Sequence, residues 1–376
     1  MADPRQELAD LASAGLLRTL RPLDSPAGPR VIREGRELWN FASNDYLGLA
    51  GHPALAEAFI EGIRRYGAGA AASRLVCGSL TPHRELEDAL AAAKGCEAAL
   101  TFPSGFATAA GSLPALAGKD DVLVLDKLCH ASLIDGARLS GATVRVFPHN
   151  DVAKLEKLLE GIRGKQAKAR VIVVTESVFS MDGDVCPLQE IVAAKERHGA
   201  MLFLDEAHAF GVIGPQGMGL AAREALQDHV EFQMGTLSKA AGLAGGYLAT
   251  SAAWRDLLVN RARSFIYTTA APPALAHASL AALELIRSAE GDGLRARLRE
   301  NVSVISPGHE SAIVPVLLGS NEAALEASRR LEEAGYLVPA IRYPTVPRGT
   351  ARLRVSVSAA HPVAAAEELA GHLGLH

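Results

Sequence analysis

Three residues near the middle of the chain have types and spacing that suit imine chemistry. Asp205 ends the apolar run AMLFLD, where a carboxylate is costly unless a cation meets it. His208 follows three residues later, and Lys239 follows the apolar run EFQMG and precedes a glycine-rich segment. A poorly solvated lysine has a lowered pKa and can form an imine, and a buried aspartate suits a pyridinium ring. Together they predict a pyridoxal-phosphate site, although each alone also fits a structural Asp–His pair or a surface lysine.

A phosphate site is predicted where the segment FPSGFATAAG follows the apolar run AALTF and begins a helix. The backbone N–H groups of Gly105 and Phe106 would then face an anion, with the helix dipole behind them. The hydroxyl groups of Ser180 and Thr236 are candidates to complete this site. Taken alone, the same segment equally fits a plain helix N-cap.

His130 follows the run DVLVLDKLC. An imidazole at such a strand end suits stacking on a flat cofactor and proton transfer near neutral pH. The alternative for this residue is a hydrogen-bonded surface histidine.

These residues need a sheet to bring them together. Between residues 40 and 274, short apolar runs alternate with helical stretches, which predicts a large domain with a mostly parallel sheet covered on both faces. The runs lie at residues 98–102, 121–126, 143–147, 169–175, 200–205, 231–236 and 245–250. Ligands of open α/β sheets bind beyond the carboxyl ends of the strands, so the residues that follow these runs are expected to be neighbours.

Two further segments flank this domain. Residues 1–39 are predicted to form an N-terminal arm, with a helix over 5–20 and a proline-rich break after it. Residues 275–376 show a strand, helix, strand, helix order that predicts a smaller C-terminal α/β domain. The expected fold class is therefore α/β with two domains and an arm.

Composition excludes several classes of function. The chain has 376 residues and a net charge of -4, which argues against nucleic-acid binding. Its four cysteines show no paired spacing typical of zinc or redox sites, and no metal site is expected. No apolar run reaches the roughly 18 residues of a membrane span, and the N-terminus lacks a signal-peptide pattern. We therefore expect a cytoplasmic protein that acts without a membrane partner.

An ordered set of motifs resembles the α-oxoamine synthases, pyridoxal-phosphate enzymes of the aspartate-aminotransferase fold (fold type I). The resemblance runs from about residue 16 to the C-terminus. The motifs are SNDYLGL (43–49), SRLVCG (73–78), PHRELE (82–87), PSGF (103–106), DKLCHAS (126–132), ESVFSMDGD (176–184), LDEAH (204–208), TLSKA (236–240) and PTVPRGTARLR (344–354). Departures from the family pattern occur at Ala72 and at Thr268, Thr269 and Ala270.

The resemblance implies a role for each candidate residue. Lys239 would form a Schiff base with the cofactor, Asp205 would pair with its pyridine nitrogen, and His208 would bind its phenolic oxygen. His130 would stack on the ring and take part in catalysis. Gly105, Phe106, Ser180 and Thr236 would contact the cofactor or its phosphate. Asn44, His130, Thr345 and Arg354 would face the substrates, with Arg354 as a carboxylate clamp. An arginine of the arm, Arg18 or the nearby Arg21, would contact the acyl substrate.

Within the family, TESVFSMDGD and PTVPRGTARLR are most similar to members that condense L-alanine with a pimeloyl thioester in biotin synthesis. The acyl carrier, CoA or acyl-carrier protein, stays open. Sibling enzymes that use glycine, 2-amino-3-ketobutyrate CoA ligase and 5-aminolevulinate synthase, are the nearest alternatives. A catalytically silent scaffold subunit is a further alternative, but such a subunit is expected to lack the lysine. The family builds each site between two subunits, which predicts a homodimer.

Overall fold

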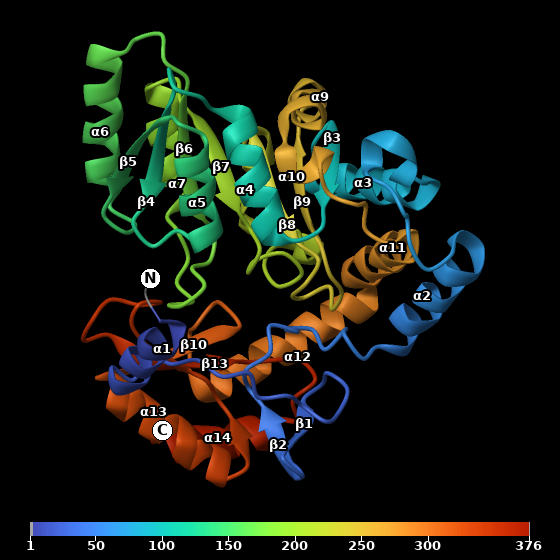
Figure 1. Cartoon of the computed structure of the whole chain (residues 1–376), viewed down its shortest axis with the longest axis vertical. Coiled ribbons are helices and arrows are strands. Elements are labelled where there is room, and N and C mark those ends of the chain that lie inside the picture. Colours follow the sequence, from blue (N-terminus) through green and yellow to red (C-terminus); the bar gives the residue numbers. More distant parts are fainter. Residues whose placement is uncertain (1–2, 376) are drawn as a thin grey trace.

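A seven-stranded sheet forms the centre of the larger part of the molecule (Figure 1). The computed structural model describes residues 3–375. In spatial order the strands are β3 (Ala98–Phe102), β9 (Gly246–Thr250), β8 (Phe232–Thr236), β7 (Met201–Asp205), β6 (Val171–Glu176), β4 (Val122–Asp126) and β5 (Thr143–Phe147). Among these seven strands, β9 alone runs in the direction opposite to the other six. The predicted mostly parallel sheet is confirmed, and each apolar run forms one of its strands.

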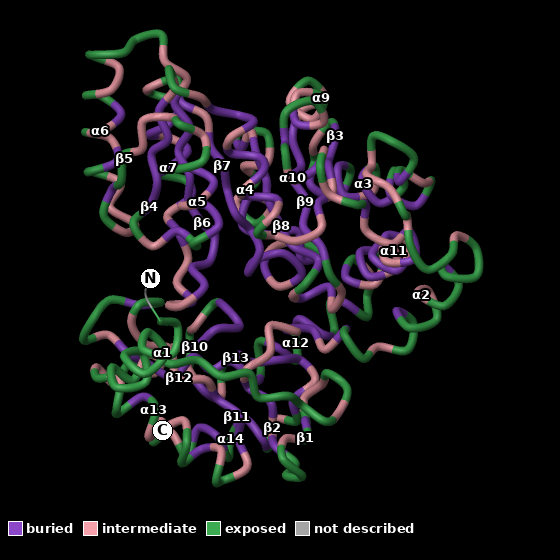
Figure 2. Tube along the Cα trace, viewed as in Figure 1, coloured by how far each residue is buried: buried purple, intermediate pink, exposed green. Residues whose placement is uncertain are grey.

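Helices cover both faces of this sheet, so its strands are almost entirely buried, except for the edge strand β5, which is partly exposed (Figure 2). One face packs against α4 (Gly105–Leu116), α5 (Ala131–Leu139), α9 (Ala252–Arg261) and α10 (Arg263–Ile266). The other packs against α6 (Val152–Lys165), α7 (Leu188–Arg197) and α8 (Leu220–Arg223), while α3 (Thr81–Lys94) packs beside β3 and β9. Strands that are covered on both faces have continuous apolar sequences, and the apolar runs of the sequence therefore predicted their positions.

Strand alternation decides which residues face the α4 and α5 side. Successive side chains of a strand point to opposite faces. Phe203 belongs to the cluster on the α4 and α5 side, whereas Leu202 and Leu204 belong to the opposite cluster. Asp205 therefore faces the α4 and α5 side, and the same count places Glu176 and Thr236 on that face.

The C-terminal part contains the predicted strand, helix, strand, helix order. Its elements are β10 (Ile313–Gly319), α13 (Asn321–Glu333), β13 (Ala351–Ser356) and α14 (Val363–Leu373). Two short strands that the sequence pattern did not predict, β11 (Tyr336–Leu337) and β12 (Ala340–Ile341), lie between α13 and β13. Strands β10, β13 and β12 form an antiparallel sheet.

The N-terminal segment also packs on the C-terminal part. Strands β1 (Arg30–Arg33) and β2 (Arg36–Asn40) form a sheet with β11. The first helix, α1, spans Pro4–Ser13, so the prediction of a helix over 5–20 was too long. Gly15 has φ of +65°, a left-handed conformation that ends a helix. Helix α2 (Pro53–Tyr66) lies beside α11 (Pro273–Arg287).

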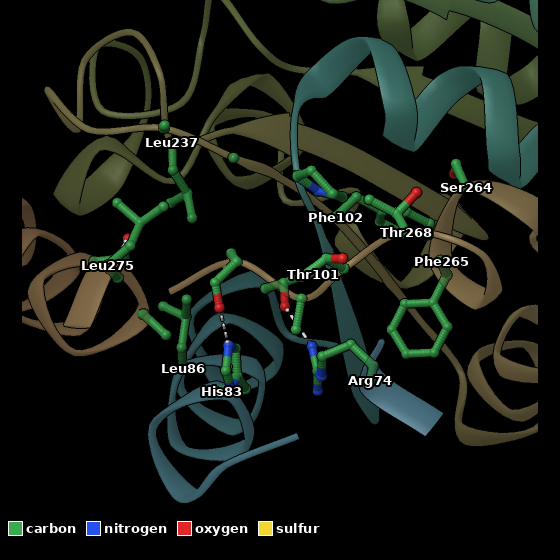
Figure 3. Close-up of a pocket in the computed structure, with 18 residues that line it drawn as sticks. Arg74, His83, Leu86, Thr101, Phe102, Leu237, Ser264, Phe265, Thr268 and Leu275 are labelled. Carbon is green, nitrogen blue, oxygen red and sulfur yellow. Dashed lines mark hydrogen bonds between the residues drawn. The ribbon is translucent and has the colours of Figure 1, made fainter. Parts of the chain in front are cut away.

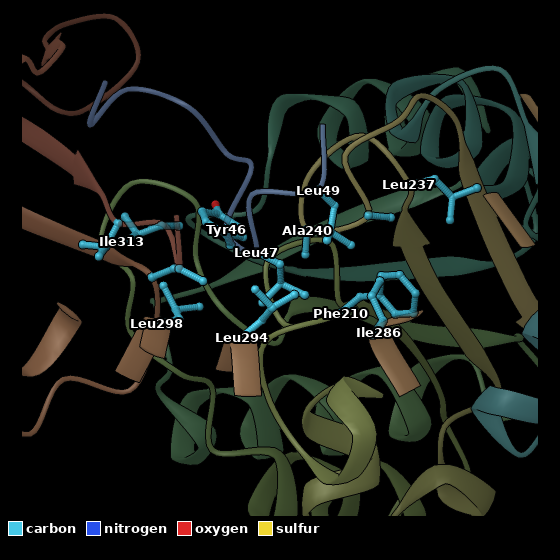
Figure 4. Close-up of a cluster of buried hydrophobic side chains, with 14 of the residues drawn as sticks. Tyr46, Leu47, Leu49, Phe210, Leu237, Ala240, Ile286, Leu294, Leu298 and Ile313 are labelled. Carbon is cyan, nitrogen blue, oxygen red and sulfur yellow. The ribbon is translucent and has the colours of Figure 1, made fainter. Parts of the chain in front are cut away.

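One apolar cluster joins the two parts of the molecule (Figure 4). It contains Tyr46 and Leu47, which follow β2. It also contains Phe210, from a loop of the large sheet, and Ile313 of β10. Helices α11 and α12 (Ala289–Ile305) supply Ile286 and several leucines to the same cluster. The loops of the large sheet that carry Phe210 and the C-terminal part are therefore held together by a shared apolar core.

Within residues 3–375, no helix is both long and apolar enough to cross a membrane. Among the described residues, no group of three or more His, Cys, Asp or Glu side chains is arranged to hold a metal ion. The four cysteines are free thiols, and Cys129 and Cys186 are buried.

Candidate active site

A cavity of about 210 Å³ lies beyond the carboxyl ends of β6, β7 and β8, beside the first turn of α4. Seven of the predicted site residues line it, namely Gly105, Phe106, His130, Asp205, His208, Thr236 and Lys239. They come from the ends of four strands, β3, β4, β7 and β8, and the connections that follow them, as expected for an open α/β sheet. The other predicted residues, Arg18, Asn44, Ser180, Thr345 and Arg354, lie outside the lining of this cavity.

Lys239 lies at the centre of the site. Its Nζ is 3.0 Å from Nε2 of His208. Burial lowers the pKa of the Lys239 amine to about 8, against the opposing effect of the Asp205 and Glu176 carboxylates. A substantial fraction of this amine is therefore neutral near physiological pH, as imine formation requires.

His208 is held from its other ring nitrogen by Tyr46. The Tyr46 hydroxyl lies 2.6 Å from Nδ1 of His208 and 3.1 Å from Oδ1 of Asn44. Burial, with the nearby Lys239 charge, lowers the pKa of the His208 ring well below its usual value. The neutral imidazole is held through Nδ1, and its Nε2 is directed at the Lys239 amine. A group that binds to this amine would therefore lie next to Nε2.

Asp205 is a buried carboxylate on the cavity wall, and its side chain is 5% exposed. Within residues 3–375 its carboxylate accepts one hydrogen bond, from the Ala207 backbone N–H at 2.9 Å. Burial raises the pKa of Asp205, and the Lys239 charge opposes the rise. A carboxylate in this position is stabilised by a cation that enters the cavity, so the site fits a pyridinium ring.

The first turn of α4 fits a phosphate. The N–H groups of Gly105 and Phe106 begin this helix, where no intrahelical acceptor exists, and Ser104 caps the turn by accepting from the Ala107 N–H at 3.0 Å. Thr236 presents a hydroxyl beside them, 2.6 Å from the Ser238 hydroxyl. A side chain at Gly246 would meet Cα of Gly105 at 2.9 Å, so glycine is required for this close approach.

His130 is the N-cap residue of α5, and its side chain lines the cavity. Its Nδ1 accepts a hydrogen bond from the Ser132 N–H at 3.2 Å and lies 2.8 Å from the Ser132 hydroxyl. Burial lowers the pKa of His130, with Asp205 opposing. The ring is therefore fixed at one nitrogen and available to a ligand at the other.

Arg354 connects β13 of the C-terminal part to the site. Its guanidinium donates to the Ser180 carbonyl at 2.6 Å and to Oδ1 of Asn44 at 3.0 Å. The remaining nitrogen, Nη2, lies 3.5 Å from the Tyr46 hydroxyl. Ser180 thus contacts Arg354 through its backbone, and Asn44 and Arg354 lie next to the His208–Tyr46 pair.

The two arm arginines have different partners. Nη2 of Arg18 lies 3.4 Å from the Thr345 hydroxyl. Arg21 forms a bidentate ion pair with Glu332 of α13, at 2.9 and 2.6 Å. Arg342 donates to the carbonyl groups of Gly15 and Leu17, so the arm lies against the segment that carries Thr345.

The segment that departs from the family pattern is held by its backbone. The Ala270 N–H donates to the Ala72 carbonyl at 2.9 Å, and His83 donates from Nε2 to the Ala271 carbonyl at 2.9 Å. A second cavity lies behind this segment, with His83 and Arg74 pointing into it (Figure 3). Arg74 pairs with Glu87 and donates to the Thr101 hydroxyl. Backbone hydrogen bonds therefore hold residues 268–271 in place, and these bonds do not involve the side chains that depart from the family pattern.

Five polar residues of the site were not predicted, namely Tyr46, Ser104, Ser132, Glu176 and Ser238. Tyr46 stands inside the SNDYLGL motif, which was the available signal for it. Glu176 follows the predicted apolar run 169–175, whereas in the structure it is the last residue of β6.

A family model describes this chain over nearly its whole length. The aminotransferase class I and II model matches residues 36–373. The chain belongs to the aminotransferase class I and II family.

Individual relatives narrow this class. The chain is 47% identical to an 8-amino-7-oxononanoate synthase of Geobacter sulfurreducens over 94% of its length and 93% of the relative's. Its structure is similar to a serine palmitoyltransferase of S. paucimobilis with bound PLP (TM-score 0.92, 29% identity, 98% and 95% covered). It is also similar to an 8-amino-7-oxononanoate synthase of Francisella tularensis (TM-score 0.77, 27% identity, 89% and 96% covered). The resemblance to the α-oxoamine synthases, and the aspartate-aminotransferase-like fold, are confirmed.

Proposed function

We propose that this chain binds pyridoxal 5′-phosphate and catalyses the condensation of L-alanine with a pimeloyl thioester to 8-amino-7-oxononanoate, a step of biotin synthesis. The free thiol and CO2 are the other products. The convergence of Lys239, His208 and Asp205 on one cavity carries this proposal. Relatives named 8-amino-7-oxononanoate synthase, at 44–48% identity, support the choice of reaction.

When bound, pyridoxal phosphate supplies an electron sink for the carbanion that forms at Cα of alanine. Lys239 then provides the amine that takes and returns the Cα proton, since its pKa of about 8 suits a base near neutral pH. Asp205 keeps a positive charge at the ring nitrogen favourable, because a buried carboxylate gains most from a cation beside it. His208, fixed by Tyr46, orients a hydrogen bond toward the phenolic oxygen.

His130 and Arg354 hold the substrates. The His130 ring lines the cavity and forms part of its wall. Arg354 is a fixed cation beside Asn44, and its Nη2 is the edge best placed to meet the alanine carboxylate. That carboxylate leaves as CO2, so a clamp on it also orients the bond that breaks.

Arg18 is the arm residue that we assign to the acyl substrate. Its guanidinium contacts Thr345, whereas the guanidinium of Arg21 is committed to the ion pair with Glu332. An arginine with one weak contact remains available to the terminal carboxylate of a pimeloyl chain.

A homodimer completes the proposed assembly. Val76 is 79% exposed and Tyr267 is 70% exposed, and Leu75 and Phe106 are also exposed. These side chains lie on or next to α4, α10 and the helical turn Arg74–Gly78, and α10 contacts both of the others. An exposed apolar surface next to the cofactor cavity favours a second copy of the chain over solvent. Light scattering should find a dimer; an active monomer would contradict this assignment.

Thiol release provides the functional test. The purified protein is incubated with pimeloyl-, acetyl- or succinyl-CoA, each with alanine or glycine. We expect release with pimeloyl-CoA and alanine. Turnover with glycine alone would instead support a sibling activity, and a Lys239→Ala variant that borohydride still links covalently to the cofactor would refute Lys239 as the attachment point.

A further inference from the structure

Glu176 is a buried carboxyl group that the mechanism above does not use. It ends β6, is 2% exposed and lines the same cavity as Lys239. It pairs in register with Asp205 on the neighbouring parallel strand, and both side chains face the α4 and α5 side. Adjacent strands lie about 4.8 Å apart, so two carboxyl groups in this arrangement disfavour each other's charge unless each has a partner. Glu176 therefore needs a contact of its own.

The backbone N–H of His130 is that contact, and it donates to Oε1 of Glu176. His130 is the N-cap of α5, so its N–H has no partner within the helix. The helix dipole also favours an acceptor with negative charge at this point. The hydrogen bond joins the end of β6 to the place where the chain leaves β4 and enters α5.

This link fixes one end of His130 while Ser132 fixes the other. Nδ1 of the ring accepts from the Ser132 N–H at 3.2 Å, and Glu176 holds the backbone from which the ring projects. The imidazole then has little freedom to turn away from the cavity. Loss of the Glu176 acceptor would free the backbone and leave the His130 N–H without its partner.

We propose that Glu176 is a positioning residue that holds the His130 imidazole against the bound cofactor by accepting a hydrogen bond from the His130 backbone N–H. Its oxygen acts as an acceptor, and its charge is not required. The inference rests on the proposed function only in that the cofactor is present.

The affinity of the apoprotein for pyridoxal phosphate tests this role, and its measurement does not require enzyme activity. Apoprotein is titrated with pyridoxal phosphate, and the visible band gives the dissociation constant for wild type and variants. Glu176→Ala should weaken binding about tenfold, and Glu176→Asp should do the same because its shorter side chain does not reach His130. Glu176→Gln should stay within about threefold of wild type, since its amide oxygen still accepts.

Thr175→Val is the matched control. Thr175 is the buried neighbour of Glu176 on the opposite face of β6, and within residues 3–375 its hydroxyl has no hydrogen-bond partner. The Thr175→Val variant should bind the cofactor with the same affinity as wild type. Thermal unfolding establishes that each variant is folded.

A double-mutant cycle separates action through His130 from a general effect on the site. In a His130→Ala background, Glu176→Asp and Glu176→Ala should cause no further loss of affinity. The proposal is overturned if Glu176→Gln binds as weakly as Glu176→Asp, or if the full loss persists without the imidazole. A wild-type protein that shows no visible band would refute the proposed function instead.

Discussion

Nζ of Lys239 lies 3.0 Å from Nε2 of His208, in a site where burial lowers the pKa of both groups. The lysine therefore has a neutral partner beside it instead of a second cation. This arrangement favours the free amine and leaves a hydrogen-bonding ring next to the point of cofactor attachment.

The first prediction concerns the pH dependence of cofactor capture by the apoprotein. The neutral amine is the reactive form, and the pKa of Lys239 is lowered to about 8. The rate at which the visible band appears should rise with pH through a midpoint near 8. Stopped-flow absorbance measures this rate, and a midpoint at the ordinary lysine pKa of 10.5 would contradict the lowered pKa of Lys239.

The second prediction concerns the charge of Asp205. Asp205→Asn keeps the size of the side chain and an acceptor for the Ala207 N–H, but it removes the anion that meets the ring nitrogen. We expect kcat to fall by about a hundredfold or more while the cofactor still binds. Steady-state kinetics on the cofactor-loaded variant decides this, and a kcat within threefold of wild type would rule out the assigned role.

The third prediction separates the arm arginines. Arg18→Ala should raise KM for the acyl thioester about tenfold with little change in kcat, because the lost contact is to a carboxylate distant from the reacting bond. Arg21→Ala is the matched control and should change KM less, since Arg21 pairs with Glu332. A larger increase in KM for Arg21→Ala than for Arg18→Ala would indicate that Arg21, and not Arg18, contacts the acyl substrate.

The fourth prediction concerns the buried ion pair between Lys94 of α3 and Glu206, the residue that follows Asp205. Both side chains are fully buried, so Lys94→Met leaves an unpaired carboxylate and should lower the free energy of unfolding by about 3–5 kcal/mol. Urea denaturation measures the change. Lys94→Met combined with Glu206→Gln should recover part of the loss, because no buried charge remains; a double variant no more stable than the single one would show that charge is not the cause.

The fifth prediction concerns His149, which contacts Asp126 at 3.1 Å and Asp184 at 2.7 Å. Hydrogen bonds to these carboxylates raise its pKa from 6.5 to about 10, against the effect of burial. Because the folded pKa is the higher one, the stabilisation is complete below pH 6.5 and is lost as pH rises toward 10. The stability difference between wild type and His149→Gln should shrink over that interval in thermal unfolding, and a constant difference would exclude this ion pair as its source.

The strand-end residues of the site were predictable because parallel strands bring their carboxyl ends to one edge of a sheet. Asp205, Thr236 and Lys239 needed only the positions of the apolar runs. Tyr46 approaches His208 from a segment far away in the chain, and periodicity contains no information about such a contact. Glu176 needed the exact end of β6, which is the least certain feature of any strand prediction.

The same limits apply to the fold. Helix α12 was not predicted, since Gly291 and Gly293 interrupt its first turns and weaken its helical pattern. The two-residue strands β11 and β12 are too short for any alternation to be detected. The predicted helix over 5–20 is too long because Leu16 and Leu17 continue the apolar pattern of the helix beyond Gly15, where the left-handed backbone ends it.

The fate of the alanine carboxyl carbon tests the central claim most directly. The protein is incubated with pimeloyl-CoA and L-alanine labelled with ¹³C in its carboxyl group, and the products are examined by mass spectrometry. The account predicts unlabelled 8-amino-7-oxononanoate together with labelled CO2, in amounts equal to the CoA released. Label retained in the acylated product, or CoA release without loss of CO2, would contradict a decarboxylative condensation at this site.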